Sequence, residues 1–207
     1  MDIFTNLEPH CAMIVGRRGC GKSVYAIQLL ETVFKKHFDS VVIICPTFEI
    51  NAAYNRDWIN NKQDRNVHIV PKQVFDRCDL NTILLHLSKQ FECCGQTLFL
   101  IDDCAFLGGV RHKETALNQL AFTSRHAGIS IWVITQKYNA VSKDFREQLS
   151  WIALFYCKDK DSFLIANDEN SVLTADERIE AANFLKDVPH GKLLIRTDLP
   201  VEYKLLN

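Results

Sequence analysis

The sequence has no long hydrophobic segment. None of its apolar runs approaches the ~20 residues that a membrane-spanning helix requires. Residues 1–6 contain neither a basic segment nor an apolar core of the kind found in a secretory signal peptide. The sequence therefore predicts an intracellular protein with no membrane partner.

Paired cysteine motifs are also missing. The chain has eight cysteines and seven histidines, but no C-x-x-C pair and no His/Cys spacing typical of a zinc site. Most of the cysteines lie in or beside apolar runs, which predicts reduced, buried thiols and no disulfide framework. We expect one exception, Cys20, to be exposed and open to thiol reagents because it lies in a glycine-rich loop.

There is no excess of positive charge. The 207 residues carry 24 Lys and Arg against 25 Asp and Glu, a net charge of −1. A protein that grips DNA as a monomer usually has a basic excess, so any nucleic-acid contact must be local or shared among subunits. Repeats, low-complexity tracts and linkers are absent as well. We therefore expect a single domain over residues 1–207, with a short arm at 1–10 and a hairpin at 192–207.

The most informative stretch is residues 16–23, which fit the phosphate-binding loop pattern G-x-x-x-x-G-K-[ST]. A buried strand is predicted before it, at 11–15, and a helix from about residue 22 after it. In this context backbone N–H groups and the helix N-terminus can hold phosphates. The alternative is a glycine-rich turn without a ligand. The predicted ATP-binding residues are Gly16, Arg17, Arg18, Gly19, Cys20, Gly21, Lys22 and Ser23, with Lys22 on the β- and γ-phosphates and Ser23 on Mg²⁺.

Strand and helix patterns alternate along the rest of the chain. Apolar strands are predicted at 40–45, 67–70, 97–101, 129–134 and 151–156. Helices are predicted around 80–91, 114–126, 142–149 and, from a capping box, 174–186. This order predicts an α/β fold with a mainly parallel sheet, helices on both faces and a C-terminal β-hairpin.

Polar residues follow two of these strands. Asp102 and Asp103 come after the strand at 97–101, and Gln136 follows the strand at 129–134. The apolar run plus Asp-Asp fits a Walker B element. Asp102 is then a Mg²⁺ ligand through water, and Asp103 orients or deprotonates the attacking water. Gln136 is a candidate sensor of the γ-phosphate. The alternative for Asp102 and Asp103 is that these strand-end carboxylates cap the next turn. For Gln136 it is ordinary strand-end hydrogen bonding.

Residues 125–136 read R-H-A-G-I-S-I-W-V-I-T-Q, which resembles the R-x-x-G-I, apolar strand, T-Q pattern of the FtsK/HerA superfamily of DNA-pumping ATPases. Residues 151–168 are similar to the segment that follows there. The resemblance is strongest to the short genome-packaging ATPases of poxviruses, giant viruses and virophages. It implies a P-loop NTPase of the ASCE/RecA-like type, a three-layer sandwich that uses ATP and Mg²⁺.

The resemblance also implies a homo-oligomeric ring, usually a hexamer, with ATP at subunit interfaces and an arginine supplied in trans. Arg125 matches that arginine, and Arg146 is the second candidate. Double-stranded DNA and a capsid protein or portal-like vertex are the implied partners. The implied location is the host cytoplasm or nucleus during virus assembly, or the virion. Two departures are Asp103, where many members have Glu, and Lys137-Tyr138, where bacterial members have Arg-Pro.

The expected function is therefore an ATP-driven DNA translocase that packages a viral genome. The loop at 108–113 offers Arg111, His112 and Lys113 as DNA-contact candidates, since a ring would repeat its positive charge. A solvated surface loop is the alternative for this segment. Two other functions stay open. One is a nucleoside or nucleotide kinase, although no arginine-rich lid is evident. The other is a P-loop scaffold protein that binds ATP without hydrolysing it.

Overall fold

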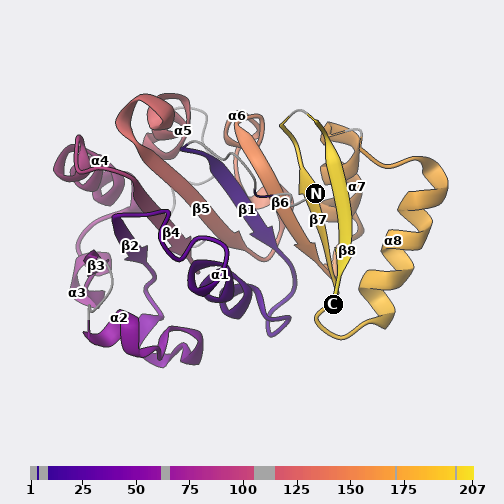
Figure 1. Cartoon of the computed structure of the whole chain (residues 1–207), viewed down its shortest axis with the longest axis horizontal. Coiled ribbons are helices and arrows are strands. Elements are labelled where there is room, and N and C mark those ends of the chain that lie inside the picture. Colours follow the sequence, from indigo (N-terminus) through magenta and orange to yellow (C-terminus); the bar gives the residue numbers. More distant parts are fainter. Residues whose placement is uncertain (1–3, 5–8, 62–65, 105–114, 171, 199) are drawn as a thin grey trace.

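An eight-stranded sheet forms the centre of the computed structural model, which describes residue 4 and residues 9–61, 66–104, 115–170, 172–198 and 200–207 (Figure 1). The strand order is β3-β2-β4-β5-β1-β6-β7-β8. The strands are β1 (Cys11–Val15), β2 (Ser40–Ile44), β3 (Asn66–Ile69), β4 (Thr97–Asp102), β5 (Ile129–Thr135), β6 (Leu149–Phe155), β7 (Lys192–Arg196) and β8 (Glu202–Leu206).

The sheet is mainly parallel, as predicted. Every pairing from β3 through β6 is parallel, whereas β7 pairs antiparallel with β6 and β8 antiparallel with β7. The predicted C-terminal hairpin is therefore confirmed as β7–β8, which extends the sheet by two strands. All carboxyl ends from β3 to β6 lie at one edge, where an open α/β sheet binds its ligands.

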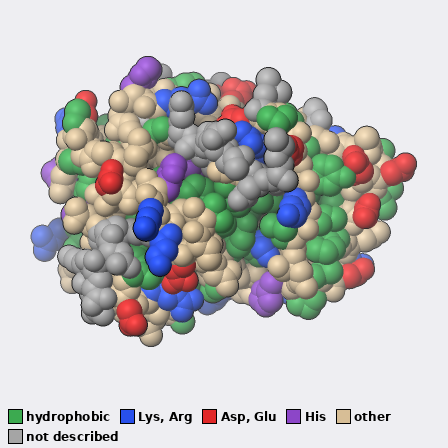
Figure 2. All heavy atoms as spheres, in the orientation of Figure 1, with side chains coloured by type: hydrophobic (Ala, Val, Ile, Leu, Met, Phe, Trp, Pro, Cys, Tyr) green, Lys and Arg blue, Asp and Glu red, His purple; other side chains and the backbone are tan. Residues whose placement is uncertain are grey.

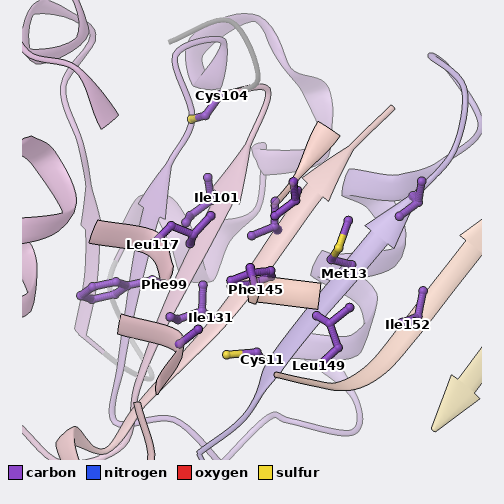
Figure 3. Close-up of a cluster of buried hydrophobic side chains, with 14 of the residues drawn as sticks. Cys11, Met13, Phe99, Ile101, Cys104, Leu117, Ile131, Phe145, Leu149 and Ile152 are labelled. Atoms are coloured by element: carbon purple, nitrogen blue, oxygen red, sulfur yellow. The ribbon is translucent and has the colours of Figure 1, made fainter. Parts of the chain in front are cut away.

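Alternating residues of the central strands supply two separate hydrophobic cores. Cys11, Met13 and Val15 of β1 pack on one face, and Ala12 and Ile14 on the other. This period of two is the pleat of a strand that is buried on both sides. Figure 3 shows the first core, with β1 side chains beside those of β4, β5 and the covering helices.

Helices cover both faces and give the predicted three layers. Side chains of α4, α5, α6, α7 and α8 join the first core, and those of α1 and α2 join the second. The helices are α1 (Lys22–Glu31), α2 (Asp57–Asn61), α3 (Lys72–Phe75), α4 (Leu80–Phe91), α5 (Ala116–Ala127), α6 (Lys143–Arg146), α7 (Lys160–Asn170) and α8 (Ala175–Asp187). Short 3₁₀ segments lie at Phe48–Ile50, Ala52–Tyr54 and Tyr138–Ala140.

Several boundaries differ from the prediction. The helix expected at 142–149 ends at Arg146, because Leu149 already pairs with Cys11 in the sheet. Helix α7 was not predicted, because its apolar residues do not form a continuous stripe. The strand between β1 and β4 is β5, which follows both in the chain.

The surface shows where the charges lie. Figure 2 shows acidic side chains gathered at the end of the molecule formed by α8, which carries Asp176, Glu177, Glu180 and Asp187. All eight cysteines are free thiols. Cys93 and Cys94 are exposed, so the prediction of buried thiols is wrong at these two positions. Within the described residues, no helix combines the length and apolarity needed to cross a bilayer.

Candidate active site

The phosphate loop connects the end of β1 to the start of α1 at the centre of the sheet edge (Figure 1). Gly21 precedes α1 with φ 97°, a left-handed conformation that a side chain would strain. At Gly16, an added Cβ would lie 2.6 Å from Phe155 Cβ of the neighbouring strand. Both glycines are therefore required by the backbone path as well as by the ligand.

The loop is fixed to the strands on either side. Gly16 N–H donates to the Thr135 carbonyl of β5, and Arg17 N–H donates to the Tyr156 carbonyl after β6, at 2.9 Å. The Lys22 ammonium donates to the carbonyls of Gly16 and Arg17 at 2.8 and 3.0 Å. These bonds hold the ammonium over the loop, at the position from which it can meet phosphate oxygens.

The two predicted Mg²⁺ ligands touch each other. Ser23 Oγ donates a 2.7 Å hydrogen bond to Asp102 Oδ2. The same oxygen accepts a 2.8 Å hydrogen bond from the hydroxyl of Tyr54. Asp102 is 2% exposed, and burial raises the pKa of its carboxyl while the bonds from Ser23 and Tyr54 oppose the rise. A hydroxyl and a carboxylate are hard oxygen donors of the kind Mg²⁺ prefers, so these residues fit the ion.

Asp103 has a different hydrogen-bond partner from that buried pair. It has φ 54°, so the backbone turns sharply directly after β4. Its Oδ2 accepts a 2.9 Å hydrogen bond from Thr47, the residue that follows the end of β2 by a short link. Asp103 is exposed to the cavity, and its carboxylate is available to a water molecule there.

A cavity of about 520 Å³ collects these groups. Its wall includes Lys22, Ser23, Asp102, Asp103 and Gln136, so the predicted Walker A, Walker B and sensor residues lie together. His190 also lines it: its Nδ1 lies 3.0 Å from the Cys20 carbonyl, and its own φ is 61°. The arrangement can hold a nucleoside triphosphate along the loop, with oxygen donors for a metal ion at one end.

Comparison with known protein families matches this chain to the poxvirus A32 protein over residues 6–198. That span covers nearly the whole sequence. The chain belongs to the poxvirus A32 protein family. This membership confirms the resemblance to viral packaging ATPases of the FtsK/HerA type, and the A32-family chain is a P-loop ATPase. No curated protein sequence matches it.

Solved structures confirm the fold. The genome packaging NTPase B204 of Sulfolobus turreted icosahedral virus 2, in complex with AMPPCP, aligns with a TM-score of 0.68 and 17% identity, covering 100% of this chain and 99% of that one. The same protein with ATP-gammaS gives 0.64 and 19%, covering 100% and 98%. The pCW3 conjugation coupling protein TcpA gives 0.53 and 16%, covering 95% of this chain and 59% of that one.

The two candidate trans-acting arginines differ in their surroundings. Arg146 is engaged within its own subunit: its side chain is 10% exposed, and its Nε and Nη2 donate to Glu169 at 2.9 and 2.7 Å. Arg125 is exposed near the end of α5, and among the described residues no ion pair or side-chain hydrogen bond reaches it. Of the two candidates, Arg125 is therefore the one whose side chain has no partner among the residues that the structure describes.

Cys20 differs from its prediction. It is 6% exposed because its side chain turns into the second core, and burial raises the pKa of its thiol. Its position in a glycine-rich loop had suggested an exposed thiol, but the loop curls over the ends of β1 and β6. The loop presents its backbone to the cavity and keeps this sulfur behind it.

The predicted DNA-contact residues Arg111, His112 and Lys113 lie outside the described residues. Within them, positive charge gathers around a second cavity of about 510 Å³, whose wall carries Arg17, Arg18, Lys137 and Lys158 with Asp159 and Gln136. Arg18 and Gln136 line both cavities. Four cations outnumber the single carboxylate of Asp159, so the net charge of this wall is positive.

Sequence reasoning missed three residues of the site. Thr47 and Tyr54 lie in the polar stretch after β2, where the sequence carries no recognised motif. His190 lies far along the chain, between α8 and β7. Pro46, directly after an apolar strand, was the available signal for Thr47, because strand ends in a parallel sheet line the ligand edge. No local pattern marks Tyr54 or His190.

Proposed function

We propose that this chain is an ATP-driven translocase of double-stranded DNA that packages a viral genome into a capsid. Membership of the poxvirus A32 protein family supports this, as does the likeness to B204, which is named a genome packaging NTPase. The single observation that carries the proposal is the contact between Ser23 and Asp102, which joins the phosphate loop to the Walker B strand.

The following roles of the site residues are part of this proposal, and their geometry supports them. Residues 16–23 bind the triphosphate, and Lys22 neutralises the β- and γ-phosphates. Ser23 and Asp102 would hold Mg²⁺, which would supply charge neutralisation at the phosphates. Asp103 accepts a proton from, or orients, the attacking water, for which its exposed carboxylate is suited. Gln136 ends β5 within the same cavity, where it can sense the γ-phosphate.

Assembly and partners form the second part of the proposal. The chain acts as a single domain, 1–207, in a ring that is most often a hexamer in this superfamily. Arg125 enters the neighbour's site and stabilises charge that develops on the transferred phosphoryl group. Arg111, His112 and Lys113 contact DNA, and a capsid protein or portal-like vertex receives the ring. The location is the host cytoplasm or nucleus during assembly, or the virion.

The alternatives are less well supported. A nucleotide kinase needs cations that bind an acceptor phosphate, and it does not need a sensor glutamine beside paired acids. A scaffold that binds ATP without turnover does not need Asp103 held by Thr47 in a strained backbone conformation.

The test is steady-state ATP hydrolysis over a range of protein concentrations, with and without double-stranded DNA. A ring with shared sites gives turnover per subunit that rises with protein concentration and again with DNA. Lys22→Ala removes the phosphate contact and is expected to abolish turnover. Turnover that depends on neither protein concentration nor DNA would favour a self-contained kinase or NTPase. Normal activity of Lys22→Ala would refute the phosphate-loop assignment.

A further inference from the structure

The buried carboxylate of Asp102 has two hydrogen-bond donors on one oxygen. Ser23 Oγ and Tyr54 Oη both donate to Oδ2, at 2.7 and 2.8 Å. A desolvated carboxylate needs such donors, because an unpaired buried charge is strongly destabilising. The two donors come from different elements: Ser23 from α1, and Tyr54 from the 3₁₀ segment that follows β2.

The two donors are not equivalent. The Ser23 oxygen is itself a predicted Mg²⁺ ligand, so its orientation depends on the metal and the nucleotide. The Tyr54 hydroxyl donates its hydrogen bond to Asp102. Among the described residues, it has no hydrogen bond to the phosphate loop or to Asp103. It can therefore hold Asp102 in one rotamer whether or not ligands are bound.

The surroundings of Tyr54 keep its hydroxyl in place. The side chain is 1% exposed and belongs to the second core, with residues of α1 and β2. Its ring lies 5.3 Å from that of Phe48, and Asn51 caps the 3₁₀ turn by accepting from Ala53 N–H. The segment is anchored at its start as well, since Thr47 donates to Asp103. One short stretch after β2 thus contacts both acids of the Walker B element.

We propose that Tyr54 is a positioning residue for the metal site: its hydroxyl orients Asp102 so that Mg²⁺ and nucleotide bind together. Tyr54 does not touch the reacting atoms and acts through Asp102. Outer hydrogen-bond partners of this kind typically change metal affinity by about ten- to a hundredfold when removed. The inference rests on the ATP- and Mg²⁺-binding part of the proposed function and is independent of DNA translocation.

Tyr54→Phe tests the role, because it removes the hydroxyl and keeps the ring. The measurement is calorimetric binding of AMPPCP to the full chain, first in EDTA and then at increasing Mg²⁺ concentration. We expect affinity in EDTA to be unchanged and the Mg²⁺ concentration for half-maximal tightening to rise about tenfold. Tyr138→Phe is the matched control: Tyr138 is also fully buried, and its hydroxyl accepts from Asn170, in a different part of the fold.

Two results would overturn the inference. One is an unchanged Mg²⁺ requirement in Tyr54→Phe. The other is an equal loss of affinity with and without Mg²⁺, which a purely structural role predicts. A double-variant cycle with Asp102→Asn gives a second measurement. If Tyr54 acts through Asp102, then Tyr54→Phe has no further effect on Mg²⁺ dependence in the Asp102→Asn background, and an additive effect would refute the coupling. Should the unchanged protein bind AMPPCP with no Mg²⁺ dependence, the metal assignment and this inference fail together, whereas the DNA test stays separate.

Discussion

At the scale of single residues, the side chains packed against the predicted phosphate-binding loop determine its conformation. Gly16 is required by the approach of Phe155, and Cys20 is turned inward among apolar side chains. The face toward the cavity is therefore mostly backbone and the cations of Arg18 and Lys22. A thiol at this position contributes to packing and leaves the cavity side of the loop to backbone groups and cations.

Burial of Cys20 predicts its reactivity. Because burial raises the pKa of this thiol, little thiolate is present near neutral pH. With iodoacetamide at pH 8, we expect Cys93 and Cys94, both exposed, to be alkylated roughly tenfold or more faster than Cys20, measured by peptide mass spectrometry over time. Raising the pH should speed modification of Cys20. Equal rates for the three thiols would show that the loop opens in solution.

At the scale of elements, the cap at the start of α8 also makes a tertiary contact. Its N-terminus has the predicted capping box, with Thr174 and Glu177 exchanging hydrogen bonds. Glu177 accepts a second bond, 2.7 Å long, from the hydroxyl of Tyr203 in β8. The residue that starts the helix therefore also joins it to the C-terminal hairpin.

Thr174→Ala removes the cap of α8. We expect a loss of about 1 kcal/mol in the free energy of unfolding, because the N–H of Glu177 loses its acceptor. Denaturant unfolding followed by circular dichroism measures the change, and Thr174→Ser, which keeps the hydroxyl, is the control. ATP hydrolysis should be unaffected at low temperature. A loss of activity without a loss of stability would mean that α8 has a direct part in the site.

At the scale of the whole molecule, the proposed ring depends on side chains that have no partner within the described part of a single subunit. Arg125 is one of them, and it lies on α5, a helix whose start is near β4 and whose end precedes β5. Because α5 runs back across the sheet, its last turn lies at the edge opposite the phosphate loop. Arg125 therefore lies away from the phosphate loop of its own chain, which agrees with the proposed action in trans.

Subunit mixing tests this arrangement. Arg125→Ala should bind AMPPCP normally and lose about a thousandfold or more in hydrolysis. Mixing it with Lys22→Ala should restore part of the activity, since the Lys22→Ala subunit offers an intact Arg125 to a neighbour with an intact loop. Arg146→Ala is the contrasting variant: it breaks the pair with Glu169, so it should lower the melting temperature. Absence of rescue at every mixing ratio would exclude action of Arg125 in trans.

Much of this molecule follows from local sequence. The phosphate loop, the buried strands, the capping box and the hairpin each depend on neighbours within a few residues, so their patterns predict them correctly. The partition of β1 into two core faces follows from alternation alone. Helix α7 was not predicted, because its apolar residues form no continuous stripe. The end of α6 was predicted too late, because it depends on where β6 begins.

The sequence by itself determined the α/β class, the Walker A and Walker B residues, and the family. Only the tertiary structure decided which residues support those acids, which of Arg125 and Arg146 is free, and that Cys20 is buried. The physical reason is the distance along the chain between the residues that interact. A helix cap or a strand pattern is stabilised by residues close in the chain, whereas the bond from Tyr54 to Asp102 and the ion pair of Arg146 with Glu169 form only after distant segments have packed.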